Sequence, residues 1–251
     1  MTDSNARPQV VAQAQPSGGQ PTQAPSASEP AVERLHQLLA DSGGQRRIVG
    51  LVGLPGAGKS TLAARWVAAI NQHHGAGCAL ALGMDGFHLT RAQLARSSDP
   101  VAALARRGAP WTFDPHALAE RLRAVRAMPQ PTAIDQGGAV RWPGYEHGTG
   151  DPAPDAITVP AHTRLLVLEG LYLLHRSDGW NLDGLLDACG YLDVDLGPAM
   201  ERLTLRHMAS WRMDRAQAWA RIQGNDRLNA RIVAATRERA DWCVPASSVG
   251  L

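Results

Sequence analysis

The chain has 251 residues, 44% of them hydrophobic, and a formal net charge of +2 at pH 7. This length suits one α/β domain with a tail, or a domain with a small insertion, and the apolar content suffices for a full core. The weak net charge argues against nucleic acid and against an acidic membrane as partners. The three cysteines are far apart and make neither a disulfide framework nor a metal pattern, so a cytoplasmic location is expected.

Residues 1–30 are rich in Gln, Pro, Ser and Ala and hold almost no large apolar residues. Such a segment buries too little apolar surface to offset the entropy of ordering, so we predict a disordered tail. Apolar residues at helical spacing then predict a helix over residues 31–40. The N-terminus lacks a basic region followed by an apolar stretch, so no secretion signal is expected. No apolar run approaches the roughly 18 residues of a membrane-spanning helix.

Strand and helix patterns alternate through the rest of the chain. Strands are expected over residues 48–53, 78–84, 164–168, 191–196 and 241–244, and helices over residues 60–70, 118–128 and most of 198–240. Residues 129–161 hold many Pro and Gly and predict loops around a hairpin, with residues 156–159 as one arm. This alternation predicts an α/β fold of three layers, in which helices cover both faces of a mainly parallel five-stranded sheet.

A glycine-rich segment, GLPGAGKST, follows the first of these strands and precedes a helix. It matches the pattern G-x-x-x-x-G-K-[ST], whose glycines let backbone N–H groups turn inward and cradle phosphates. Its lysine, Lys59, is the only one in a chain with 24 arginines, which indicates that this position needs a compact ammonium rather than any positive charge.

The pattern predicts ATP or GTP binding in a P-loop NTPase fold. Lys59 is expected to reach the β- and γ-phosphates, and the Ser60 hydroxyl to help hold Mg²⁺. The predicted nucleotide-binding residues of this segment are Gly53, Pro55, Gly56, Ala57, Gly58, Lys59, Ser60 and Thr61.

Two acidic residues, Asp85 and Glu169, follow the second and third predicted strands. Because ligands of open α/β sheets bind beyond the carboxyl ends of the strands, both carboxylates are expected in the crevice that holds the phosphate loop. There a carboxylate can orient a hydroxyl and accept its proton, or hold Mg²⁺ through water. Two structural interpretations stay open, an Asp-Gly turn at Asp85 and a helix or turn cap at Glu169.

Six segments together resemble the phosphoribulokinase/uridine kinase superfamily, which includes bacterial pantothenate kinase. They are GLPGAGKST, MDGFHL, RRGAPWTFD, GYEHGTGDPAPDAITVP, LLVLEGLYLL and NDRLNARI. Within the superfamily the chain looks most like the nucleoside/nucleotide kinase-like proteins and the kinases associated with fructose transport. The resemblance covers about residues 30–251 and implies a kinase domain over 31–251, with an acceptor hairpin or loops over 131–161 and a lid over 198–224.

The resemblance also implies roles for individual residues. Asp85 would be the base for the acceptor hydroxyl, and Glu169 would lie near Mg²⁺ together with Ser60. Arg206, in the lid, would join Lys59 in stabilising charge on the transferring phosphoryl group. Asn225 and Asn229 would lie near the adenine pocket, and the residues placed on the acceptor side are Phe87, His88, Arg106, Arg107, Tyr145 and His147.

Some of these acceptor-side residues have ordinary structural interpretations as well. His88 could be a surface-loop histidine, and Arg106 and Arg107 could form a solvated helix end whose charges complement the helix dipole. Gly86-Phe87-His88 stands where uridine kinases carry an aromatic pair, which argues against uridine as the acceptor.

The expected activity is therefore transfer of the γ-phosphoryl group of ATP, with Mg²⁺, to a hydroxyl of a small molecule such as a sugar, a nucleoside or a pantothenate-like alcohol. A nucleotide-dependent regulator that hydrolyses ATP without an acceptor is the alternative. A nucleic-acid kinase would need a basic channel, against which the weak net charge speaks. A homodimer is a further expectation, since dimers are the commonest symmetric assembly.

Overall fold

The computed structural model describes residues 29–129, 138–146 and 149–249. Its centre is a five-stranded sheet in the order β2-β5-β1-β6-β7, in which every neighbouring pair is parallel. The strands are β1 (Arg47–Gly53), β2 (Ala79–Gly83), β5 (Leu165–Gly170), β6 (Ala188–Asp193) and β7 (Trp242–Pro245). All residues of β1 after Arg47 are buried, as expected for a central parallel strand covered on both faces. The predicted α/β fold is confirmed.

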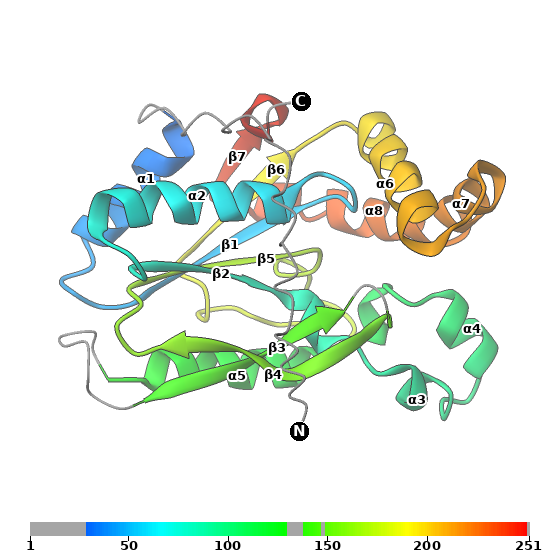
Figure 1. Ribbon diagram of the computed structural model, residues 1–251, viewed down its shortest axis with the longest axis horizontal. Coiled ribbons are helices and arrows are strands. Elements are labelled where there is room, and N and C mark those ends of the chain that lie inside the picture. The colour runs from blue at the N-terminus through cyan, green and yellow to red at the C-terminus, as the bar shows by residue number, and fades with distance from the viewer. Residues whose placement is uncertain (1–28, 130–137, 147–148, 250–251) are drawn as a thin grey trace, which may run out of the picture.

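Helices and a hairpin cover the two sides of this sheet. In Figure 1, α1 (Pro30–Ala40) and α2 (Lys59–His74) lie above the sheet, while α5 (Pro115–Ala127) lies below it. The apolar residues of α2 recur at helical spacing and bury one face, with Leu62, Trp66 and Ile70 in the core. Because α2 begins at Lys59, directly after the phosphate loop, the packing of this helix also fixes the end of that loop.

A separate antiparallel hairpin, β3 (Ala139–Glu146) with β4 (Asp151–Pro160), lies on the side opposite α2 (Figure 1). Trp142 of β3 is fully buried, and its indole Nε1 donates a hydrogen bond to the Gly83 carbonyl at 3.0 Å. A Cβ on Gly86 would lie 2.1 Å from the Pro143 carbonyl oxygen, so only glycine lets β3 pass this close. The predicted hairpin is confirmed. It packs against the end of β2 and the turn that holds Asp85.

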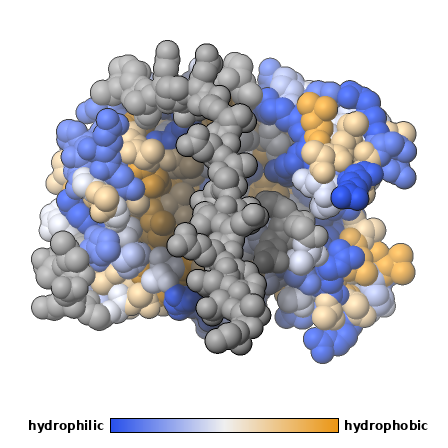
Figure 2. All heavy atoms as spheres, viewed as in Figure 1, coloured by the Kyte–Doolittle hydropathy of each residue, from blue (hydrophilic) through white to orange (hydrophobic). Residues whose placement is uncertain are grey.

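The remaining helices form two lobes at one end of the sheet. One lobe holds α6 (Leu196–Trp211) and α7 (Arg215–Arg221), which continue through a π-helical turn (Ile222–Asp226) into α8 (Arg227–Ala234). The other holds α3 (Arg91–Leu94) and α4 (Pro100–Ala105). Short 3₁₀ turns lie at Met84–Phe87, Pro110–Thr112, Arg237–Arg239 and Ala246–Val249. Figure 2 shows the two lobes separated by a notch on the right of the molecule.

Several predicted boundaries differ from the structure. The fourth strand was expected over residues 191–196 but spans Ala188–Asp193, because the small side chains of Ala188 and Gly190 give no apolar strand signal and Leu196 already begins α6. The helix expected from residue 118 begins at Pro115, where the Asp114 carboxylate caps it by accepting from the Ala117 N–H at 2.8 Å. Strand β2 ends at Gly83, so Asp85 lies in a 3₁₀ turn just beyond it.

The remaining expectations concern the N-terminal tail, membrane insertion, the cellular location and the oligomeric state. The predicted disordered tail falls almost entirely on residues 1–28, outside the described residues. Within the ranges that the structure covers, none of the helices combines the length and the hydropathy that a bilayer span requires. The cytoplasmic location and the homodimer stay predictions.

Candidate active site

A cavity of 550 Å³ opens between the phosphate loop, the end of β2, the hairpin and α6. It brings together eleven of the residues that the sequence singles out: Pro55, Gly56, Lys59, Ser60, Asp85, His88, Arg107, Tyr145, Glu169, Arg206 and Asn229. These residues come from segments spread over much of the chain. The fold therefore places residues predicted to bind the nucleotide and residues predicted to bind the acceptor in the wall of the same cavity.

The phosphate loop has the backbone shape that an anion cradle requires. Gly56 and Gly58 adopt left-handed conformations, with φ of +77° and +96°. Arg202 of α6 donates a hydrogen bond from Nε to the Gly56 carbonyl at 2.8 Å, and its buried Nη2 has no hydrogen-bond partner among the described residues. A buried guanidinium N–H without a described partner, next to a glycine-rich loop of this backbone shape, favours an anionic ligand at this position.

Lys59, Ser60 and Glu169 form a tight polar cluster at the start of α2. Lys59 is only 8% exposed, and its Nζ donates to the Leu54 carbonyl at 3.1 Å. Burial lowers the pKa of Lys59, while the negative charges of Glu169 and Asp85 oppose that shift. The Ser60 hydroxyl donates to Glu169 Oε1 at 2.8 Å.

The order of the strands explains why the two predicted carboxylates meet the loop. Strand β5 lies between β1 and β2, and Glu169 is paired in register with Leu51 on one side and Gly83 on the other. Glu169 therefore lies between the phosphate loop and Asp85. Burial raises the pKa of the Glu169 carboxyl, the Lys59 charge opposes this, and the Asp85 charge adds to it.

This donor set fits a nucleotide with Mg²⁺. Magnesium prefers hard oxygen ligands and is usually held by one or two protein groups together with water and phosphate oxygens. The Ser60 hydroxyl and the Glu169 carboxylate supply such oxygens next to the Lys59 ammonium. The glycine-rich loop lies beside them, and Arg202 contacts this loop at the Gly56 carbonyl, so the residues present match what a phosphate chain would require.

The acceptor side of the cavity is lined by aromatic rings. His88 is half-buried and its ring packs on Phe113 and Tyr145, with ring centroids 3.9 and 4.8 Å away. Its Nδ1 lies 2.8 Å from the Asp85 carbonyl, and because a carbonyl only accepts, Nδ1 carries the proton and Nε2 keeps a free lone pair. Burial lowers the pKa of His88, which favours this neutral form. His88 is therefore no surface-loop histidine.

Arg107 braces this wall instead of forming a solvated helix end. Its side chain is buried and donates to the carbonyls of Leu89 and Gly150 and, at 3.2 Å, to the Asp151 carboxylate. The guanidinium thereby ties the segment after Asp85 to the start of β4. Tyr145 donates its hydroxyl to the same Gly150 carbonyl at 3.2 Å.

Other predicted residues lie off the cavity wall. Phe87 packs in the core against Trp142, with ring centroids 5.0 Å apart. Arg106 donates to Asn229 at 3.4 Å, and Asn225 donates to the Arg107 carbonyl at 2.7 Å, so these side chains stabilise the turn after α4. Gly53, Ala57, Gly58 and Thr61 belong to the loop without lining the cavity, and His147 lies outside the described residues.

Sequence reasoning missed a polar and aromatic group on the lid side of the cavity. His207 Nε2 lies 3.0 Å from the Asp226 carboxylate, and the Trp211 ring stacks on His207 with centroids 4.6 Å apart. The Arg221 guanidinium lies 4.4 Å from the Trp211 ring centroid. His207 and Trp211 are four residues apart in one predicted helix, and this spacing was the signal that they share a face.

The close approach of α6 to the loop makes Gly56 sensitive to substitution. A Cβ at this position would lie 2.2 Å from the Ala199 carbonyl oxygen, and the left-handed backbone adds strain of about 1–3 kcal/mol. We expect Gly56→Ala to weaken ATP binding by about tenfold or more, as measured by titration of ATP against the purified protein. The matched control is Gly197→Ala in α6, where nothing lies within 4 Å of the added carbon. Unchanged ATP affinity in Gly56→Ala would contradict the cradle.

Comparisons with known proteins identify the family of this chain. A sequence profile of the Phosphoribulokinase / Uridine kinase family matches residues 48–245. A Schizosaccharomyces pombe protein, provisionally named a uridine kinase, is 35% identical over 196 residues, which cover 75% of this chain and 78% of that protein. A Zygosaccharomyces rouxii protein named as an ATP-dependent kinase is 33% identical over 176 residues, which cover 60% of this chain and 46% of that protein. This chain thus spans about half the length of that yeast kinase.

Solved structures give the same picture. A Silicibacter protein, provisionally described as a fructose transport system kinase, has a TM-score of 0.71 and 31% identity, covering 85% of this chain and 98% of its own. A Saccharomyces cerevisiae P-loop protein has a TM-score of 0.71 at 23% identity, covering 86% of this chain and 97% of its own, and shows the fold alone. The profile match spans most of the chain and includes the phosphate loop, Asp85 and Glu169. This chain therefore belongs to the phosphoribulokinase/uridine kinase family and is a P-loop kinase of the uridine kinase type.

Proposed function

We propose that the chain transfers the γ-phosphoryl group of ATP to a hydroxyl group of a small molecule, such as a sugar, a nucleoside or a pantothenate-like alcohol. One observation carries the proposal: the wall of a single cavity runs from Lys59 and Ser60, past Asp85, to His88 and Tyr145. The volume of 550 Å³ lies within the range of small-molecule sites, which favours a small acceptor beside the phosphates.

Asp85 is the group best placed to act on the acceptor. It lies between the phosphate loop and the aromatic wall, and no donor in the described part of the chain is bonded to its carboxylate. The carboxylate can therefore accept the hydrogen bond of an acceptor hydroxyl, orient its oxygen toward the phosphoryl group and take the proton as the oxygen attacks. His88 fixes the backbone of the same turn by donating to the Asp85 carbonyl.

The phosphate side would bind and neutralise the transferring group. The backbone N–H groups around Gly56 and Gly58, together with Lys59, would hold the phosphate chain. Ser60 and Glu169 would hold Mg²⁺, which when bound neutralises charge on the β- and γ-phosphates. Arg206 lines the cavity on α6, where its positive charge acts on both Lys59 and Glu169, and would stabilise charge on the phosphoryl group from the opposite side.

Water must be kept from the phosphoryl group, since it would compete with the acceptor. The rings of Phe113, Tyr145 and Trp211 line part of the cavity. Closure of the predicted lid over residues 198–224 would complete this enclosure. The stack of Trp211 on His207, itself paired with Asp226, would keep the lid helices rigid during that motion.

ADP release measured against a panel of hydroxylated small molecules tests the proposal. With ATP and Mg²⁺ present, we expect slow background release and a large increase with one chemical class of acceptor. Sugars, nucleosides and pantothenate-like alcohols form the three arms of the panel, and reactions without protein provide the baseline. ATP hydrolysis at one rate, unaffected by every acceptor, would overturn the proposal and favour a nucleotide-dependent regulator.

A further inference from the structure

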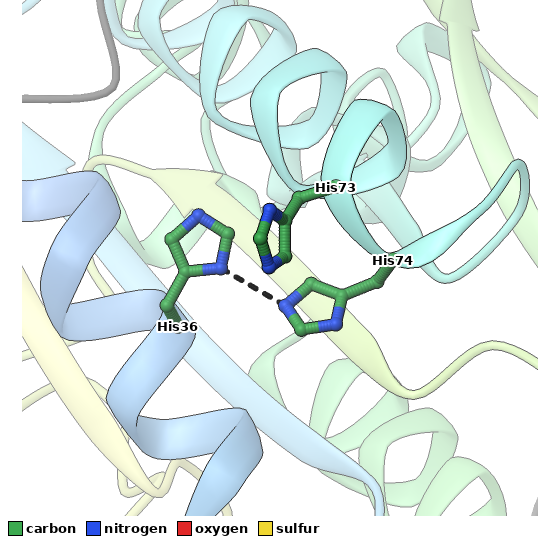
Figure 3. Close-up of side chains that lie close together, drawn as sticks. All are labelled: His36, His73 and His74. Carbon is green, nitrogen blue, oxygen red and sulfur yellow. Dashed lines mark hydrogen bonds between the residues drawn. The ribbon is translucent and has the colours of Figure 1, made fainter.

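Three histidines meet on the surface at the side of the molecule that α1 and α2 cover. His36 lies on α1, and His73 and His74 lie in the last turn of α2. Figure 3 shows the three rings turned toward one another across the gap between the two helices. One nitrogen of each ring lies within 4.8 Å of those of the others, and His36 Nδ1 is 2.9 Å from His74 Nε2.

The fold fixes the backbone positions from which these three side chains project. Helix α1 buries Val32, Leu35 and Leu39 in the core, which places His36 beside them at the edge of the buried face. Helix α2 ends at His74, and Gly75, with a positive φ of +97°, turns the chain away directly after it. Both helices are thus anchored by packing that does not involve the histidines, so the cluster is preorganised.

The spacing of the nitrogens suits a bound cation. In a tetrahedral zinc site with metal–nitrogen distances of about 2.0–2.1 Å, two ligating nitrogens lie about 3.3 Å apart. The distances here, from 2.9 Å to at most 4.8 Å, lie on both sides of that value. Side-chain rotations alone can therefore bring three imidazole nitrogens to coordination distance, with no movement of the helices.

The surroundings also favour the protonation state that binds metal. Burial lowers the pKa of His74, and the neighbouring His36, His73 and Arg164 lower it further. Neutral imidazole is the form that coordinates metal ions. The Arg164 guanidinium also acts against a bound cation, so affinity has to come from coordination by the three rings rather than from net charge.

We propose that His36, His73 and His74 bind one divalent transition-metal cation of the zinc type, with solvent completing a tetrahedral shell. Imidazole is a preferred ligand of such cations, whereas Mg²⁺ prefers oxygen. The cation would join α1, which precedes the family-matched residues 48–245, to the end of α2. Since α2 has 16 residues, the site lies about 24 Å from Lys59 at its other end and is separate from the phosphate loop.

Zinc titration of the full chain by isothermal calorimetry tests this site, with excess Mg²⁺ present to occupy the oxygen ligands of the cavity. We expect one Zn²⁺ per chain, and a rise in Tm of about 5 °C or more at saturating metal. Substitutions His73→Ala and His74→Ala should each weaken this binding by about 100-fold or more and abolish the shift in Tm. The control is His116→Ala, which removes an exposed histidine on α5 that lies beside Glu120.

The outcomes separate the proposal from incidental binding. Zinc affinity that is unchanged in both variants, or absent from the wild-type chain at millimolar metal, would overturn it. Each variant is checked for its Tm without metal, and His73→Gln, which keeps a polar side chain, replaces any variant that fails to fold. Because the readouts are metal affinity and Tm, a failure here leaves the proposed phosphoryl transfer untouched, and the reverse also holds.

Discussion

Replacing Asp85 with asparagine is expected to lower the rate of phosphoryl transfer by about 10²- to 10⁴-fold, the usual contribution of a general base. Asparagine has nearly the same shape but no basic oxygen, so it can hold an acceptor hydroxyl and cannot take its proton. ATP affinity should change much less, because in the proposed site the phosphates would be bound by the phosphate loop and Lys59 rather than by Asp85. Initial rates at saturating ATP and acceptor, together with the Kd for ATP, measure the two effects separately.

The control for Asp85→Asn is Asp155→Asn. Asp155 is an exposed residue of β4 that pairs with Arg121 at 3.8 Å, and its left-handed backbone, with φ of +52°, is one that asparagine tolerates. Asp155 is not among the residues that line the cavity, so this substitution removes the same charge and should leave the rate unchanged. Near-normal phosphoryl transfer by Asp85→Asn, in a protein with wild-type Tm, would remove Asp85 from the role of base.

Replacing Lys59 with alanine is expected to reduce kcat by about 10²- to 10³-fold, as for the loss of one preorganised group that stabilises transition-state charge. ATP binding should also weaken, since Nζ is the ammonium at the phosphate loop. The fold should survive, because within the described residues the amine makes a single hydrogen bond, to the Leu54 carbonyl, and burial already disfavours its charge. Measurements of kcat, the Kd for ATP and Tm distinguish loss of chemistry from loss of structure.

The Lys59→Arg variant tests whether this position requires an ammonium group or only a positive charge. The guanidinium keeps the charge but is larger, planar and rigid, and Lys59 is nearly enclosed in the loop. We therefore expect Lys59→Arg to be almost as impaired as Lys59→Ala. Arg231→Ala, which removes an exposed cation of α8, is the control for the positive charge that Lys59→Ala loses. Full activity of Lys59→Arg would show that any positive charge suffices at this position.

Local sequence signals were enough to predict the parts of the fold that lie close together in the chain. The phosphate loop is one continuous segment between a strand and a helix. The spacing of apolar residues was enough to predict that strand and that helix. The meeting of Asp85 and Glu169 was predictable because strand ends share one edge of a parallel sheet. The order of the strands was not predictable from local pattern, since β5 lies between β1 and β2 through contacts between distant segments.

Contacts between segments that are distant in sequence also explain why the surroundings of some site residues could not be predicted. The acceptors of Arg107 come from Leu89, Gly150 and Asp151, which lie far from it in sequence. Phe87 stands beside Asp85 in the chain, but the 3₁₀ turn directs its ring into the core against Trp142. Asn225 reaches the backbone of a residue 118 positions earlier. None of these contacts has a local signature.

The fate of the γ-phosphoryl group is the most direct test of the proposed activity. ATP labelled in the γ-phosphate is incubated with the protein, Mg²⁺ and the acceptor that raises ADP release most, and the labelled products are separated. The proposed transfer predicts that the label appears in a phosphorylated acceptor in equal amount to the ADP formed. Label recovered as inorganic phosphate, with the acceptor unmodified, would contradict phosphoryl transfer to a small hydroxyl compound.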